Sequence, residues 1–172
     1  FTSMRPTLLL ATLTLCVFSV ALSGLSGLAT TTTYSLSSGD EGGCGCKNAR
    51  NEKYTAAPSF PIFGKQGDYW CGSGCGKCFR LTAQGKSATQ GTGNGGKGTI
   101  DVLVTDACPL NGNQEWCAAP NRYGYKFHFD LNDSVGQIRA LGWDNPVVKF
   151  VEIPCEFSKT QFYKSCQCHK GK

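Results

Sequence analysis

Asp130 lies in a segment whose apolar and polar residues alternate, Lys126-Phe127-His128-Phe129-Asp130-Leu131. A β-strand sends successive side chains to opposite faces, so the phenylalanines and Leu131 can enter a core while Asp130 shares the other face with Lys126 and His128. Flanking hydrophobic bulk partly desolvates such a carboxyl group, which raises its pKa. A carboxyl with a raised pKa can donate a proton near neutral pH, as a general acid does. The alternative is a solvated strand residue without a chemical role.

The cysteines are the second group of residues that could do chemistry. Two clusters have spacings that suit zinc, Cys71-x3-Cys75-x2-Cys78 and Cys166-x-Cys168-His169. Zinc requires thiolates, whereas an oxidising compartment pairs cysteines as disulfides. The choice therefore depends on where the chain is located.

The amino-terminal segment predicts secretion. Met4-Arg5 precedes an apolar run from Leu8 to Ala21, which leads into small residues that end at Ala29. A basic start, a short apolar middle and a small-residue exit are typical of a signal peptide, whereas a membrane anchor would need a longer uninterrupted run. Residues 1–29 are therefore expected to be a signal peptide, with residues 1–3 an upstream remnant. Residues 30–172 are expected to form one secreted, extracellular domain that is not held in a membrane.

Secretion favours disulfides over metal. The expected mature chain has 143 residues and keeps ten of the 11 cysteines, because Cys16 leaves with the signal peptide. Ten is an even number, so we expect five disulfides, no metal and no cofactor. Cys44 and Cys46 flank a single residue, as do Cys166 and Cys168. Such neighbours diverge in extended backbone and should bond to different partners.

Charge and aromatic content point to a neutral partner. The mature chain has 16 Lys and Arg against 12 Asp and Glu, and its basic residues form no run. Nucleic acid is therefore not the expected partner. A sugar polymer is neutral and binds through aromatic faces. Candidate aromatic platforms are Trp70, Trp116, Trp143, Tyr69, Tyr123 and Tyr125.

Several short strands with turns between them must position these residues. Alternation predicts strands over 78–82, 99–105, 123–131 and 147–153, a helical turn or two over 48–54, and a short amphipathic helix over 133–141. The glycine-rich stretch 85–98 matches the letters of a dinucleotide fingerprint, but it runs into a strand rather than a helix, so we interpret it as a connecting loop. The pattern indicates a small disulfide-bonded β-barrel or sandwich.

Four blocks resemble glycoside hydrolase family 45 in the order of that family's signatures. They are Cys75-Gly76-Lys77-Cys78-Phe79-Arg80-Leu81-Thr82, Val104-Thr105-Asp106-Ala107-Cys108-Pro109, Asn111-Gly112-Asn113-Gln114-Glu115-Trp116-Cys117 and His128-Phe129-Asp130-Leu131. The resemblance covers 44–169 and is nearest to the animal enzymes. It implies a mainly β fold, a six-stranded double-psi β-barrel with short helices and long disulfide-tied loops, shared with expansins and barwin-like proteins. It also implies a monomeric endo-β-1,4-glucanase (a cellulase) that acts on β-1,4-glucan polysaccharides such as cellulose.

The resemblance implies hydrolysis with inversion, in which an acid protonates the leaving oxygen and a base activates water on the far face of the sugar. Asp130 matches the family's general acid. Two candidates remain open for the base. Asn113 matches a branch that uses an imidic acid as base. Asp40 could replace an Asp that follows a Thr-Arg-Tyr element in fungal relatives, which Thr32-Thr33-Tyr34 resembles, although Leu36 stands at the matching position.

Other residues are expected to support the site. Asp106 should orient the network around the base, with a turn-capping role as the alternative. His128 shares a face with Asp130 and is expected to stabilise the acid's neighbourhood. Substrate-binding residues are expected to be Tyr34, Trp116, Tyr125, His128 and Trp143. Asn132-Asp133-Ser134 is a glycosylation sequon beside this strand.

Two non-catalytic functions remain as alternatives. An expansin-like protein that binds glucan and loosens walls would share the fold and the acid motif but lack a working base. A barwin-like protein would bind carbohydrate without catalysis. The Asn-Gly-Asn-x-x-Trp-Cys block that contains Asn113 favours the hydrolase.

Overall fold

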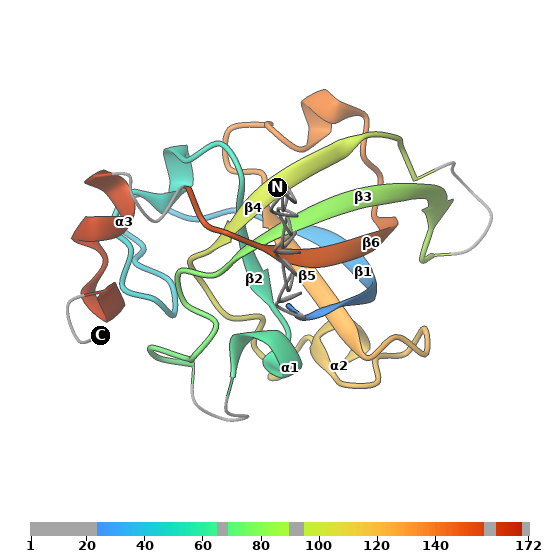
Figure 1. The fold of residues 1–172 in the computed structure, drawn as a ribbon, viewed down its shortest axis with the longest axis horizontal. Coiled ribbons are helices and arrows are strands. Elements are labelled where there is room, and N and C mark those ends of the chain that lie inside the picture. Colours follow the sequence, from blue (N-terminus) through green and yellow to red (C-terminus); the bar gives the residue numbers. More distant parts are fainter. Residues whose placement is uncertain (1–23, 65–68, 90–94, 157–160, 170–172) are drawn as a thin grey trace, which may run out of the picture.

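The computed structural model describes residues 24–64, 69–89, 95–156 and 161–169. Within these ranges six strands close into one barrel, in the order β1-β5-β2-β4-β3-β6 (Figure 1). The strands are β1 (Ser26–Tyr34), β2 (Thr55–Pro58), β3 (Cys78–Ser87), β4 (Thr99–Val104), β5 (Phe127–Asn132) and β6 (Pro146–Ile153). The predicted six-stranded β-barrel is confirmed.

Short helices lie in the connections between the strands. They are η1 (Ala49–Asn51), α1 (Phe60–Phe63), α2 (Gln114–Cys117), η2 (Arg139–Leu141), α3 (Gln161–Ser165) and η4 (Gln167–His169). In Figure 1, α3 lies at the edge of the molecule, outside the barrel. No helix of the described ranges is long and apolar enough to cross a membrane.

The barrel interior is built on aromatic rings from alternating strand positions. Phe79, Phe129 and Phe150 are fully buried, and their ring centroids lie 5.3 to 5.9 Å apart. Edge-on ring packing of this kind contributes about 0.5–1.5 kcal/mol per pair beyond area burial. Phe129 and Leu131 therefore enter the core as the alternation predicted, which directs Asp130 to the other face.

The parallel pairing of β1 with β5 determines which residues surround Asp130. Thr30 lies opposite His128, and Thr32 lies opposite Asp130. Paired residues in a sheet project to the same face, so these two threonines share the face of the acid. This neighbourhood joins segments almost 100 residues apart in the sequence.

Five disulfides tie the loops to the barrel. They join Cys44 to Cys75, Cys46 to Cys166, Cys71 to Cys168, Cys78 to Cys155 and Cys108 to Cys117. Both pairs of neighbouring cysteines bond to different partners, as predicted. Every cysteine of both candidate zinc clusters is thereby part of a disulfide and offers no thiolate.

Two predicted elements differ from the structure. The expected helix over 133–141 is a series of turns that ends in η2, with Val135 58% exposed. The Asp133 carboxylate accepts the backbone N–H groups of Ile138 and Arg139, and Gly136 has a φ of 80°, so the chain turns there instead of coiling. The predicted strand over 123–131 begins only at Phe127, because the Asn121 side chain caps a turn that includes Tyr125.

The first strand includes residues that were assigned to the signal peptide. Ser26 to Ala29 pair with Val151 to Val148 of β6, and Ala29 is fully buried. The backbone N–H of Leu25 also donates to Glu152 Oε2 at 3.3 Å. Cleavage after Ala29 would therefore remove the first half of β1 from the barrel.

Candidate active site

Asp130 faces a cavity of about 570 Å³ on the wall of the barrel. The cavity is lined by most of the predicted catalytic residues and three aromatic side chains, namely Asp130, Asp106, Asn113, Tyr34, Tyr69 and Trp70. A larger cavity of about 830 Å³ beside α1 and α2 is lined by mostly apolar residues and Lys126, without a carboxyl group. Of these two cavities, the smaller one is therefore the candidate for acid–base chemistry.

The environment of Asp130 favours a proton-donating carboxyl group. Burial raises its pKa to about 6, and the negative charge of Asp106 acts in the same direction. The Thr32 hydroxyl donates a hydrogen bond to Asp130 Oδ1 at 2.8 Å, which partly offsets this rise. Because Oδ1 already accepts this bond, the acidic proton is left to Oδ2.

A chain of hydrogen bonds leads from Asp130 into the barrel wall. His128 Nε2 lies 3.1 Å from Thr32 Oγ1, and its Nδ1 lies 2.8 Å from Thr30 Oγ1. Asn121 Nδ2 donates to the same Thr30 oxygen at 2.7 Å. Burial lowers the pKa of His128 to about 3, so the ring is neutral.

The direction of this chain follows from the number of protons available. Thr32 gives its one hydroxyl proton to Asp130, so it can only accept from His128, and Nε2 must be the protonated ring nitrogen. Nδ1 then accepts the Thr30 proton. Every donor from Asn121 onward points toward Asp130, which stabilises the carboxylate that proton donation leaves behind.

Asp106 lies on the same cavity at the end of β4. Its Oδ1 accepts the backbone N–H groups of Gly43, at 2.5 Å, and of Ala107, at 2.8 Å. Burial raises the pKa of Asp106, these two hydrogen bonds lower it, and the charge of Asp40 raises it. Asp106 is therefore both a turn cap and a carboxyl group that faces the cavity.

Tyr34 lines the same cavity as the two carboxyl groups. Burial raises the pKa of its phenol well above the ordinary value, and the charges of Asp106 and Asp130 add to that effect. Tyr34 Oη and Thr105 Oγ1 are buried neighbours within the described ranges: the Thr105 hydroxyl acts to lower the Tyr34 pKa, yet neither oxygen has a hydrogen bond of full geometry. A polar ligand or water that paired with either would relieve an unfavourable burial.

The two candidate bases are placed differently. Asn113 precedes α2, and its backbone carbonyl accepts the backbone N–H groups of Trp116 and Cys117 at 3.1 and 2.8 Å. The Cys108–Cys117 disulfide closes this loop, and Asn113 lines the cavity. Asp40 is exposed and accepts the Ser37 N–H at 2.6 Å. It is not among the residues that line the cavity.

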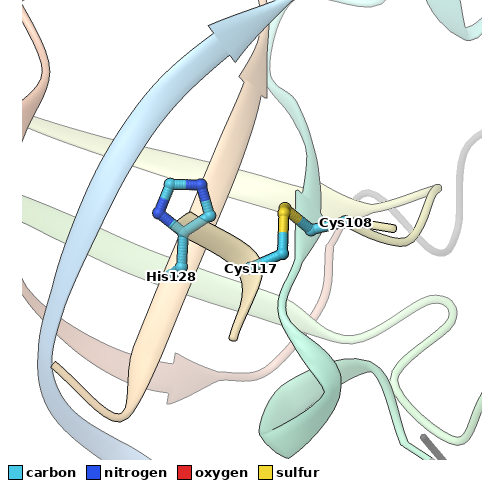
Figure 2. A group of neighbouring side chains, drawn as sticks. All are labelled: Cys108, Cys117 and His128. Carbon is cyan, nitrogen blue, oxygen red and sulfur yellow. A yellow bond between two sulfur atoms is a disulfide. The ribbon is translucent and has the colours of Figure 1, made fainter. Parts of the chain in front are cut away.

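Cys108, Cys117 and His128 form a cluster that has the residue types of a metal site. Their ligand atoms lie within 4.8 Å of one another, and all three residues are buried. Figure 2 shows the two sulfurs bonded as a disulfide beside the imidazole ring. A disulfide offers no thiolate and both ring nitrogens are already hydrogen-bonded, so the cluster packs the Asn113 loop against the acid network rather than holding a cation.

Comparison with known proteins agrees with this geometry. A family model described as EXPB1-like domain 1 matches residues 29–161. Endoglucanase-5 of Hypocrea jecorina is 40% identical over 155 residues, which cover 81% of this chain and 62% of that relative. An endoglucanase of Mytilus edulis is 30% identical over 164 residues, which cover 81% of this chain and 90% of the relative.

Solved structures of endoglucanases are also similar to this chain. The glycoside hydrolase family 45 endoglucanase EG27II, as a mutant in complex with cellobiose, superimposes with a TM-score of 0.74 at 37% identity, over 84% of this chain and 90% of that one. The chain belongs to the glycoside hydrolase family 45 endoglucanases. The family 45 β-1,4-D-endoglucanase Cel45A of the blue mussel Mytilus edulis superimposes with a TM-score of 0.72 at 29% identity, over 83% of this chain and 92% of that one.

This family 45 endoglucanase places its four predicted binding Tyr and Trp residues in different settings. Trp116 stacks on Tyr123, with ring centroids 4.6 Å apart, and lies 5.7 Å from the His128 ring. Trp143 is only 6% exposed, and its indole N–H donates to the Lys97 carbonyl at 2.9 Å. Tyr125 is half-buried in the turn capped by Asn121 and does not line the cavity. Of the predicted binding residues, Tyr34 lines the cavity directly.

A second cavity of about 450 Å³ extends the site past Tyr34. It shares Thr33 and Tyr34 with the first cavity and is lined farther on by Arg139, Trp143 and Asp144. The buried indole of Trp143 therefore forms part of the wall near the far end. Two adjoining cavities with the acid in one of them make an elongated site suited to a polymer.

Tyr69 and Trp70 are site residues that the predicted binding set left out. They are 38% and 48% exposed and line the catalytic cavity. The sequence offered one signal, two adjacent aromatic residues immediately before Cys71. Nothing in their spacing placed them beside Asp130, because the disulfides and the Gly42–Cys46 loop determine that position.

Proposed function

We propose that this enzyme cleaves internal bonds of a β-1,4-glucan such as cellulose by an inverting single displacement, with Asp130 as the general acid. The observation that carries the proposal is a half-buried carboxyl group whose pKa is raised to about 6 and which faces an elongated cavity. Asp130 Oδ2 gives its proton to the glucosidic oxygen as the bond to the anomeric carbon breaks. The Thr32, His128, Thr30 and Asn121 chain then stabilises the resulting carboxylate.

Water attacks the anomeric carbon from the opposite face, and Asn113 is our proposed base. Its position on the cavity supports it over Asp40, which is exposed and lies outside the lining. An ordinary amide is a poor base, so Asn113 must act as an imidic acid. The nitrogen takes a proton from water while the oxygen releases one, which returns the amide. Asp106, on the same cavity, is the proposed carboxylate of the network that receives this second proton.

Tyr69 and Trp70 form the proposed sugar platform of the catalytic cavity. Exposed aromatic faces beside a catalytic acid suit the apolar faces of glucose rings. The complex of the related EG27II with cellobiose supports a glucan as ligand. We name these two residues the aromatic platform.

Reducing-sugar release from carboxymethylcellulose tests the proposal. The wild type should release reducing ends, and Asp130→Asn should release none while it still folds and binds cello-oligosaccharides. Turnover by Asp130→Asn would remove Asp130 from the acid role. Binding of glucan by a folded wild type that releases no reducing sugar at any pH would favour a second candidate, an expansin-like glucan-binding protein, which the EXPB1-like family model supports.

We further propose that the protein is secreted and monomeric, and that it keeps Ser26 to Ala29 after processing. Five disulfides agree with an oxidising extracellular compartment. The pairing of these four residues with β6 supports a cleavage site upstream of Ser26. Amino-terminal sequencing of the secreted protein tests this boundary, because a chain that begins at Thr30 would contradict it.

A further inference from the structure

The two halves of the aromatic platform are held by different parts of the molecule. The Tyr69 ring packs on Phe60 at 5.2 Å, and its hydroxyl accepts the Leu110 N–H at 3.2 Å, so the barrel side of the site holds it. Trp70 precedes Cys71, whose N–H donates to the Gly43 carbonyl at 2.8 Å and whose sulfur bonds to Cys168. Trp70 is thus attached to the carboxyl-terminal part of the chain.

Residues Gln161–His169, which we name the C-terminal strap, bind the loop behind Trp70. The Gln167 N–H donates to the Gly45 carbonyl at 3.0 Å, and its side-chain Nε2 donates to Glu41 Oε2 at 2.6 Å. The Cys168 N–H donates to the Cys44 carbonyl at 3.3 Å. The disulfides Cys46–Cys166 and Cys71–Cys168 add two covalent links between the strap and the loops on either side of Trp70.

The strap and Trp70 meet at Gly45. A Cβ atom added to Gly45 would lie 2.7 Å from Gln167 Cβ and 3.1 Å from Trp70 Cη2. Gln167 and the edge of the indole therefore both lie against the same side of Gly45, where a side chain would otherwise stand. Gly45 also has a φ of 64°, a conformation that favours glycine. Because glycine has no side chain, Gln167 and the indole can both approach its backbone closely.

We propose that the C-terminal strap is a positioning element for substrate binding, which holds Trp70 in the orientation that stacks on a glucose ring. This inference rests on the proposed role of the aromatic platform. A side chain that is ordered before binding does not lose its freedom when the ligand arrives, so affinity is higher. The acid network lies on β1 and β5, and the strap's hydrogen bonds and disulfides go to the loops at 41–46 and 71 instead. Loss of the strap's hold should therefore weaken binding and leave the hydrogen bonds that tune Asp130 unchanged.

The double variant Cys71→Ser/Cys168→Ser tests the inference, because it removes the covalent link between the strap and the residue that follows Trp70. The Cys46–Cys166 disulfide still joins the strap to the adjacent loop. We expect KM for cellohexaose to rise about three- to tenfold, the equivalent of ordering one side chain on binding, with kcat changing less than KM and the alkaline limb of the pH profile unchanged. The matched control is Cys78→Ser/Cys155→Ser, which removes the disulfide between β3 and the segment after β6. It should lower the melting temperature without raising KM.

Trp70→Ala separates this inference from the proposed function. If Trp70→Ala leaves KM unchanged, Trp70 does not bind the substrate, and both the proposed role of the aromatic platform and the strap inference are refuted. If Trp70→Ala raises KM but the folded Cys71→Ser/Cys168→Ser variant does not, the strap inference alone is overturned. Cutting the disulfide in the Trp70→Ala background should add nothing, because the strap acts through the indole. Gln167→Ala, which keeps every disulfide, decides the matter by the same KM readout if the serine variant does not fold.

Discussion

Replacing Thr32 by valine should move the pH range in which the enzyme works. The substitution keeps the β-branched shape and removes the hydroxyl that donates to Asp130 Oδ1 at 2.8 Å. A hydrogen bond to a charged group contributes about 1.5–3 kcal/mol, and one pKa unit corresponds to about 1.4 kcal/mol. The bond favours the ionised form, so its loss should raise the pKa of Asp130 from about 6 by on the order of one to two units.

The sign follows from the role of Asp130. A general acid works only while protonated, so activity falls as pH rises through its pKa. In Thr32→Val the alkaline limb of kcat/KM should therefore shift upward by the same one to two units. Thr82→Val is the matched control, because Thr82 pairs with the Thr99 hydroxyl on the exposed outer face of β3. An alkaline limb that stays in place in folded Thr32→Val, or moves downward, would refute the assignment of Asp130 as the acid tuned by this bond.

Three further predictions concern stability, the base and glycosylation. Burial raises the Asp130 pKa from the ordinary 3.8 to about 6, so the free energy of unfolding should fall by up to about 3 kcal/mol as pH rises through that interval. In urea unfolding, Asp130→Asn should therefore be more stable than the wild type at pH 8 and lose this advantage near pH 3. Asn113→Ala should lower kcat by about two orders of magnitude or more and Asp40→Ala by less than about threefold, with the reverse result making Asp40 the base. Asn132 is fully buried and its Nδ2 donates to the Ala49 carbonyl at 2.8 Å, so the intact mass of the secreted protein should include no glycan at this sequon.

The sequence predicted the parts of the site that depend on local pattern. Alternation identified the strand that carries Asp130, because the Phe129 and Leu131 side chains must be buried together. The even number of cysteines in an expected secreted chain predicted five disulfides. The pairing could not be predicted, because spacing along the chain does not determine which sulfurs meet in space.

The parts that the sequence did not reveal depend on contacts between distant segments. Thr30 and Thr32 stand in a run of four threonines without any feature of a catalytic site, and only the parallel pairing of β1 with β5 brings them to His128 and Asp130. Ser26 to Ala29 read as the end of a signal peptide because small and apolar residues suit both a cleavage region and a buried strand. Trp143 was predicted to bind sugar and stays a candidate: its indole is mostly buried and donates to the Lys97 carbonyl, but it also lines the second cavity, a position that its spacing did not indicate.

Proton NMR of the first product formed from cellohexaose tests the central claim most directly. Direct attack by water opposite Asp130 inverts the anomeric carbon, so the new reducing end should appear first as the α-anomer and reach the β-anomer only through mutarotation. Asp130→Asn under the same conditions should give neither signal. Early appearance of the β-anomer in the wild type would contradict the single displacement and the roles assigned to Asp130 and Asn113.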